Sequence, residues 1–233
     1  MNKWWEKYLD CIDSKYFKSH CKNYKIIPFG NYCLPRVITT INRLKPTKKC
    51  GEESFPFDLC FSKFKSNISL LATNFEEFFD DIYFDDKEKW WKNDKTNMCF
   101  SHDFLAKKDF IERYQKRIEN FYKVLNNTQI HIYFVIATVE IVTQQEINLF
   151  VDLINKHREN KTYDVIIINQ TDVIQKFNFE NVHCINLTND KSFEIINKNR
   201  DWVSELKKMK SIQARIFNHK VIYQLSKIIK NKK

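Results

Sequence analysis

The chain has 233 residues, of which 43% are hydrophobic and 15% aromatic, and this composition supports a sizeable core and excludes an intrinsically disordered protein. The formal net charge is +10, but the cations are mostly lysines spread along the chain, so we expect a solvated basic surface and no nucleic-acid partner. No segment approaches the ~20 consecutive apolar residues that a membrane span requires.

Seven cysteines, an odd number, argue against a disulfide framework. None of them forms a Cys-x-x-Cys pair, which argues against a structural zinc site. The N-terminal segment lacks the apolar stretch of a secretory signal. We therefore expect a cytoplasmic protein without a bound metal or cofactor, and the oligomeric state is left open.

The hydrophobic pattern predicts one α/β domain over residues 1–233, in three parts. Residues 1–22 form an amphipathic helical segment, residues 24–190 form the core, and residues 191–233 form basic helices. The apolar stripe of the C-terminal helices is typical of packing against the core, with lysines on the solvated faces. A dimer contact or a contact with an anionic surface is the alternative interpretation of this stripe.

Four apolar segments predict the strands of the core. They are nearly continuous, as parallel strands buried on both faces require. The predicted strands are residues 24–29, 130–137, 163–169 and 182–187. A helical pattern over residues 144–159 separates the second strand from the third, which indicates a right-handed crossover between parallel strands. We therefore expect a three-layer α/β sandwich with a mostly parallel central sheet.

Between the first two predicted strands, the sequence pattern predicts helices, a loop and an irregular segment. Helical spacing of apolar residues predicts helices over residues 33–44, 66–79 and 106–125. Residues 45–60 are predicted to form a loop whose apolar and aromatic content indicates that it folds back over the core. Residues 80–97 alternate between acidic, basic and aromatic types and are predicted to be irregular.

The turn from the first strand into the helix that follows carries the strongest candidate for chemistry. It contains Gly30, Asn31, Tyr32 and Cys33, and ligands of parallel α/β sheets bind at the carboxyl ends of strands. A cysteine in the first turn of a helix lies at the positive end of the helix dipole, which lowers a thiol pKa. Free backbone N–H groups at the helix start can stabilise an oxyanion. The ordinary alternative is a buried cysteine that acts as a small hydrophobic residue.

A nucleophilic cysteine needs a base, and His102 is the best candidate among six histidines because it lies between a short apolar segment and a predicted helix. Asp58 lies in the aromatic loop and is a candidate for orienting His102 or contacting a substrate. Asp103 is the competing acid. His102 as a structural histidine and Asp58 as a turn cap are the alternative interpretations.

Three motifs in this order resemble one family, the putative papain-like cysteine peptidases, a domain of unknown function. The family pattern is a strand that ends in Ser-Leu-Gly-x-x-Cys, then a Pro-Phe-Asp-Trp element, then a histidine. The matching segments of this chain are Phe-Gly-Asn-Tyr-Cys at residues 29–33, Phe-Pro-Phe-Asp-Leu at residues 55–59, and Ser-His-Asp at residues 101–103. The resemblance spans roughly residues 24–140. Pro28 and Phe29 replace Ser-Leu, and Leu59 replaces the tryptophan.

The resemblance implies that Cys33 is the nucleophile, His102 the general base, and Asp58 an orienting or substrate-facing acid. Gly30, Asn31, Tyr32 and Asp103 are the candidates for substrate or oxyanion binding. It also implies a papain-like fold with an antiparallel sheet, whereas the apolar pattern predicts parallel strands, and for the fold we favour the pattern.

The sequence thus leads to two main hypotheses, beside a third, a basic interaction protein that uses its lysine-rich C-terminal helices. The first is a cysteine-dependent hydrolase or acyltransferase acting on a peptide, a glycan or a small molecule. The second is a glycan-related module that binds a sugar or nucleotide without cysteine catalysis, in which residues 30–33 hold a phosphate. One glycine in this turn is too few for a dinucleotide fingerprint.

Overall fold

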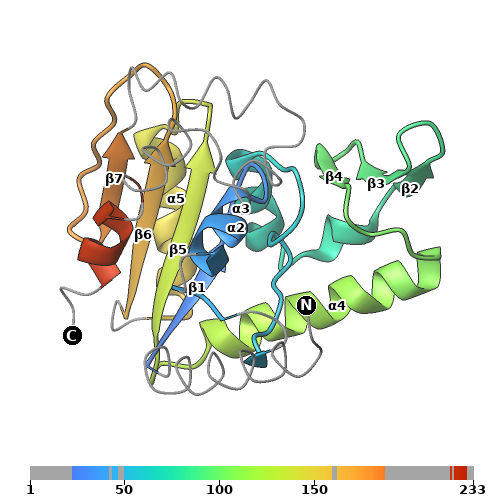
Figure 1. Ribbon diagram of the computed structural model, residues 1–233, viewed down its shortest axis with the longest axis horizontal. Helices are drawn as coiled ribbons and strands as arrows, with labels where there is room; N and C mark the ends of the chain where they lie inside the picture. The colour runs from blue at the N-terminus through green and yellow to red at the C-terminus, as the bar shows by residue number, and fades with distance from the viewer. Residues whose placement is uncertain are drawn as a thin grey trace, which may run out of the picture.

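A computed structural model gives the fold (Figure 1). It describes residues 23–41, 44–46, 50–158, 162–186, 221 and 223–229.

A four-stranded sheet occupies the left half of the view in Figure 1, and its strand order is β1-β5-β6-β7. All three neighbouring pairs are parallel. The strands are β1 (Tyr24–Pro28), β5 (His131–Thr138), β6 (Tyr163–Asn169) and β7 (Val182–Asn186). The parallel sheet predicted from the apolar segments is therefore confirmed, and no strand end differs from the prediction by more than one residue.

Alternate side chains of these strands enter two separate hydrophobic cores. Ile27, Phe29 and Phe134 belong to the larger core. Ile26, Tyr133 and Val135 belong to the smaller core on the other face. Because both faces are covered by apolar side chains, both strand faces must be hydrophobic, which explains the continuous apolar segments.

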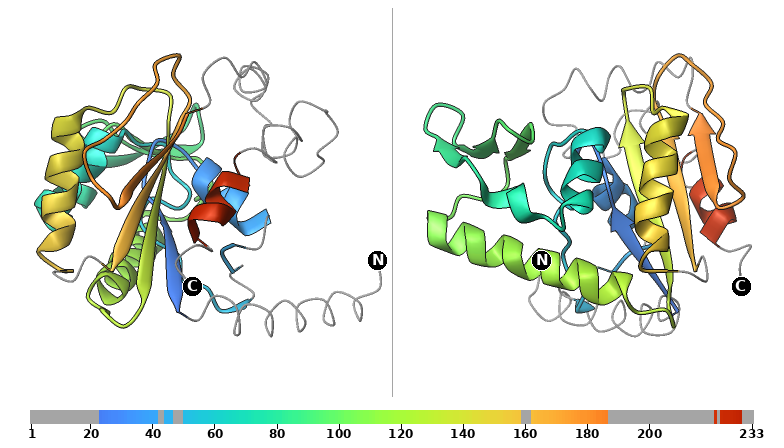
Figure 2. Two further views of the ribbon diagram at one scale, coloured as in Figure 1. Left: turned by 90° about the vertical axis from the view of Figure 1, so that its left-hand side faces the viewer. Right: turned by 180° about the vertical axis from the view of Figure 1, so that it is seen from behind.

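Helices pack against both faces (Figure 2). The larger core contains residues of α3 (Phe64–Ala72), α4 (Lys107–Leu125) and α5 (Gln144–Asn155). The smaller core contains residues of α2 (Leu34–Ile41) and of the helical residues 223–229.

The predicted helical segment of residues 1–22 and most of residues 191–233 lie outside the described residues. For that reason the stricter description as a three-layer sandwich, and a single domain over the whole chain, stay predictions. In the part of the chain that the structure describes, no helix has the length and apolar character of a membrane-spanning segment.

A second, antiparallel sheet corrects the prediction that residues 80–97 are irregular. It contains β2 (Ile82–Asp85), β3 (Trp90–Asn93) and β4 (Met98–Phe100), in the order β2-β3-β4, and follows a short 3-10 helix, η2 (Glu76–Phe79). Trp91 of β3 packs against Phe110 of α4 with ring centroids 5.0 Å apart. These strands of three or four residues are too short for periodicity to distinguish them from a loop, and packing on α4 stabilises them.

Candidate active site

Cys33 lies where the sequence places it, between β1 and α2. Phe29 continues the sheet because its N–H donates to the Val135 carbonyl at 2.9 Å. At Gly30 a Cβ atom would approach Ile136 Cγ2 to 3.2 Å, so the turn passes close to β5 and favours glycine. The Cys33 carbonyl accepts the Val37 N–H at 3.0 Å, which makes Cys33 the residue that caps α2.

The Cys33 thiol is buried, with 2% of the residue exposed. Burial raises its thiol pKa to about 11, and the contribution of its own backbone N–H, which lowers the pKa, is smaller. The expectation that the helix start would lower this pKa is therefore wrong for the described conformation, because desolvation of the buried thiolate has the largest effect on it. The resting thiol is protonated at neutral pH.

The pKa predicts a distinctive pH profile for thiol alkylation. We expect the rate at which iodoacetamide modifies Cys33 in the unliganded protein to keep rising up to about pH 11, since a raised pKa leaves little thiolate below that pH. Peptide mapping at a series of pH values measures this rate. A rate that levels off near neutral pH would contradict the buried, protonated thiol.

Asn31 is engaged on three sides and stabilises the turn. It has a left-handed φ of 36°. Its side-chain amide donates to Thr138 Oγ1 at 3.0 Å, and its side-chain oxygen accepts the Phe64 N–H at 3.0 Å. The Ser62 N–H donates to its carbonyl at 3.1 Å. The Asn31 side chain thus connects the end of β1 to β5 and α3. Asn31 therefore has a structural role in addition to its predicted role in binding.

Asn31 and Tyr32 line a cavity of about 330 Å³. Tyr32 also donates a hydrogen bond to Gln170, which follows β6. This cavity therefore adjoins the carboxyl ends of β1 and β5, where parallel sheets bind ligands. Its other lining residues are Phe61, Ser62, Lys63, Asn97, Val139 and Glu140.

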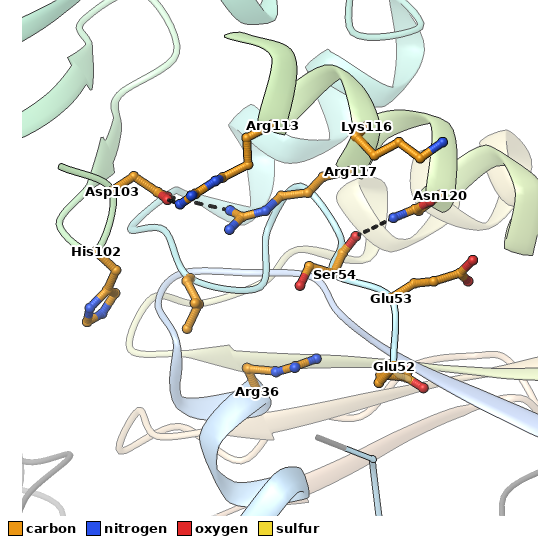
Figure 3. Close-up of a pocket in the computed structure, with 11 residues that line it drawn as sticks. Arg36, Glu52, Glu53, Ser54, His102, Asp103, Arg113, Lys116, Arg117 and Asn120 are labelled. Carbon is orange, nitrogen blue, oxygen red and sulfur yellow. Dashed lines mark hydrogen bonds and ion pairs between the residues drawn. The ribbon is translucent and has the colours of Figure 1, made fainter. Parts of the chain in front are cut away.

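His102 and Asp103 line a different and larger cavity of about 510 Å³ (Figure 3). Its other lining residues are Arg36, Glu52, Glu53, Ser54, Leu59, Arg113, Lys116, Arg117 and Asn120. Burial lowers the pKa of His102; the nearby Arg117 acts in the same direction and Asp103 opposes it. His102 is therefore neutral at pH 7, the form in which an imidazole can accept a proton.

Asp103 is held by α4. Its carboxylate accepts hydrogen bonds from Arg113 and, at 2.7 Å, from the Tyr114 hydroxyl. Arg117 forms a longer ion pair with it, with Nη1 3.6 Å from Oδ2. Figure 3 shows the His102 imidazole directed away from this carboxylate. Asp103 thus positions the arginines of α4, and among the described residues it forms no hydrogen bond with His102.

Asp58 contacts α2. Arg36 Nη1 donates to Asp58 Oδ2 at 3.0 Å, and the carboxylate is 1% exposed. Its second oxygen, Oδ1, is buried and accepts no hydrogen bond within the described part of the chain. The ion pair connects the aromatic loop to the helix that begins after Cys33.

Of the predicted site residues, His102 and Asp103 line the larger cavity and Asn31 and Tyr32 line the smaller one. Cys33, Gly30 and Asp58 line neither of these two cavities. Over the described residues, no hydrogen bond joins the Cys33 thiol to His102. Burial raises the pKa of the Cys60 thiol to about 12, the Ser62 hydroxyl opposes this rise, and Arg117, Cys33 and Asp58 have smaller effects on it.

The arginines are the residues that the sequence prediction missed. Arg113 and Arg117 are four residues apart and so lie on one face of α4. Arg36 lies three residues after Cys33, one turn further along α2. Their spacing was visible in the sequence, but their acidic partners lie in other elements and gave no local signal. Among the described residues, no group of three or more histidine, cysteine or acidic side chains is placed to hold a metal ion.

A comparison with protein-family models gives a match that covers more than half of the chain. The model of a family described as "Putative papain-like cysteine peptidase (DUF1796)" matches residues 24–173. This segment includes the Cys33 turn, the aromatic loop, His102 and the three strands β1, β5 and β6. No curated protein and no solved structure matches the chain.

Proposed function

The chain belongs to the putative papain-like cysteine peptidase family, and from this premise we propose that it is a cysteine-dependent hydrolase that acts on a peptide-like acyl compound. The position of Cys33 supports the proposal most directly. It caps α2 immediately after a strand of a parallel sheet, where helix-start N–H groups are available to an oxyanion. The acyltransferase alternative has no support from the comparisons.

In the proposed reaction, His102 takes the proton of the Cys33 thiol, and the thiolate attacks the substrate carbonyl carbon. The negative oxygen of the tetrahedral intermediate accepts hydrogen bonds from backbone N–H groups at the start of α2. His102 then gives its proton to the leaving amine, the C–N bond breaks, and an acyl thioester remains on Cys33. Water, deprotonated by His102, hydrolyses this thioester and restores the thiol.

The described conformation is a resting one in this proposal, because the thiol is buried and protonated. Substrate binding has to bring His102 within hydrogen-bond reach of the thiol, about 3–4 Å, before the proton moves. Asp58 and Asp103 act through the arginines that they hold, Arg36 and Arg113, and not through a direct contact with the imidazole.

Replacement of the proposed base tests this assignment. We expect His102→Ala to slow the labelling of Cys33 by a peptide vinyl sulfone by about 10²–10⁴-fold, since general-base assistance contributes that much. Intact-mass measurement over time, followed by peptide mapping, gives the rate. His157→Ala is the matched control, because His157 bonds to Asn126 and lines neither of the two cavities. Equal labelling rates in wild type and His102→Ala would remove His102 from the mechanism.

The arginine-lined cavity favours a second candidate, a module that binds an anionic sugar or nucleotide without cysteine catalysis. The two candidates differ in their dependence on the thiol. A binding module keeps its full function in Cys33→Ser, whereas the hydrolase loses turnover in that variant.

A further inference from the structure

The large cavity beside His102 has basic side chains on opposite sides (Figure 3). Arg36 enters from α2, Arg113 and Arg117 extend down from α4, and Lys116 extends along α4 beside them. Two helices that are distant in the sequence therefore direct positive charge into one space. A cavity of about 510 Å³ has room for the end of a peptide or for a phosphorylated small molecule.

The acidic side chains of this cavity are already paired. Glu52 is held by Lys25 at 3.0 Å and by the fully buried Lys45 at 2.9 Å. Glu53 pairs with Lys123 at 2.8 Å. None of these three lysines lines the cavity. Glu52 and Glu53 are thus neutralised from outside the cavity. Asp103, the third acid of the wall, pairs with Arg113 and more distantly with Arg117, and Arg36 pairs with Asp58 through one of its nitrogens, so the arginines of the wall outnumber the carboxylates that they pair with.

Arg117 carries the unsatisfied donor. The residue is 8% exposed, and its Nη1 is buried and donates no hydrogen bond within the described residues. The nearest carboxylate oxygen, Asp103 Oδ2, lies 3.6 Å away, beyond a good hydrogen bond. A buried guanidinium N–H without an acceptor is costly, and an anionic oxygen placed in the cavity would supply that acceptor.

We propose that this cavity is an oxyanion-binding site, which takes a carboxylate or phosphate group of the ligand through Arg117, Arg36 and Lys116. In its stronger form, in which the ligand is the substrate of Cys33, the inference rests on the proposed function. It then assigns the enzyme to acidic substrates: a peptide with an acidic side chain or terminal carboxylate, or a phosphorylated compound. Anion binding itself does not depend on the thiol.

Calorimetric titration of the full chain carrying Cys33→Ser tests the site without any catalytic step. The probes are inorganic phosphate, N-acetylglutamate and its neutral match N-acetylglutamine. We expect one or both anions to bind, and N-acetylglutamine to bind at least about tenfold more weakly, since a charge-assisted arginine contact is lost. Which of the two anions binds shows whether the site takes a phosphate or a carboxylate group. Equal binding of N-acetylglutamine, or no binding of either anion at millimolar concentration, would overturn the proposal.

Variants localise the binding. Arg117→Gln is expected to lower the affinity for the anion by about tenfold or more. Because that change also breaks an ion pair with a buried carboxylate, Lys116→Gln provides a second variant on an exposed side chain, with an expected weakening of about threefold. Lys108→Gln, on the same helix but outside the cavity, should leave the affinity unchanged. Affinity that is insensitive to both Arg117→Gln and Lys116→Gln would place the anion elsewhere and refute the site.

The hydrolase proposal and the oxyanion-site proposal can be refuted independently of each other. If anions bind to Cys33→Ser as expected but wild-type Cys33 never reacts with a peptide electrophile, the oxyanion site stands and the hydrolase is refuted. If Cys33 reacts but no anion binds, the hydrolase stands and the assignment to acidic substrates is refuted.

Discussion

The Cys33→Ala variant is expected to lose hydrolysis, with kcat/KM at least about a thousandfold lower than in the wild type, because the thiol that forms the acyl intermediate in the proposed mechanism is removed. A chromogenic acyl ester serves as the generic substrate, and hydrolysis is followed by release of the chromophore. The loss should appear in kcat, since removal of one buried sulfur leaves the cavity around His102 unchanged.

The same variant should remain folded. Replacing a buried cysteine by alanine removes one atom, which costs about 1 kcal/mol of unfolding free energy. Far-UV circular dichroism and a denaturant titration establish this. Cys60→Ala is the matched control, because Cys60 is equally buried and lies within electrostatic range of Cys33. Activity that survives in Cys33→Ala, or that disappears equally in Cys60→Ala, would contradict a specific role for Cys33.

The largest effect on stability is expected at Arg158. Its side chain is fully buried, and its guanidinium donates to the carbonyls of Leu125 and Asn127 at 2.9 Å and of Thr162 at 3.1 Å, with a further bond to the Ile130 carbonyl. These carbonyls belong to the C-terminal end of α4 and to the segments that precede β5 and β6.

Arg158→Met is expected to lower the free energy of unfolding by about 3–5 kcal/mol, because several buried carbonyls lose their donor and the end of α4 loses a favourable charge. Urea denaturation measures the change. Lys156→Met, two residues away at an exposed position, should change it by less than about 0.5 kcal/mol. A loss below about 1 kcal/mol in Arg158→Met would show that water replaces these hydrogen bonds without cost.

The strands of the central sheet could be predicted because their signal is local. A strand such as β6, Tyr-Asp-Val-Ile-Ile-Ile-Asn, is apolar on both faces, and only a strand covered on both sides needs that pattern. The antiparallel sheet gave no such signal. In β3 only alternate residues are buried, over four positions, and the pairing with β2 and β4 decides the structure.

The candidate site could be predicted only in part. The turn that holds Cys33 follows from a strand, a glycine and a helix start, which are adjacent in the sequence. The burial that keeps its thiol protonated depends on tertiary packing, and so does the pairing of Arg36 with Asp58 of the aromatic loop. Residue types and spacing give no measure of desolvation, which is why the dipole argument predicted the wrong direction for the Cys33 pKa.

Trapping the acyl intermediate tests the central claim most directly. The wild-type chain is mixed with an activated acyl ester, quenched in acid within a turnover, and digested for mass spectrometry. The proposed mechanism predicts an acyl group on Cys33, released by hydroxylamine as a thioester and absent in Cys33→Ala. Hydrolysis that proceeds with no acyl group on Cys33, or with the acyl group on another residue, would contradict it.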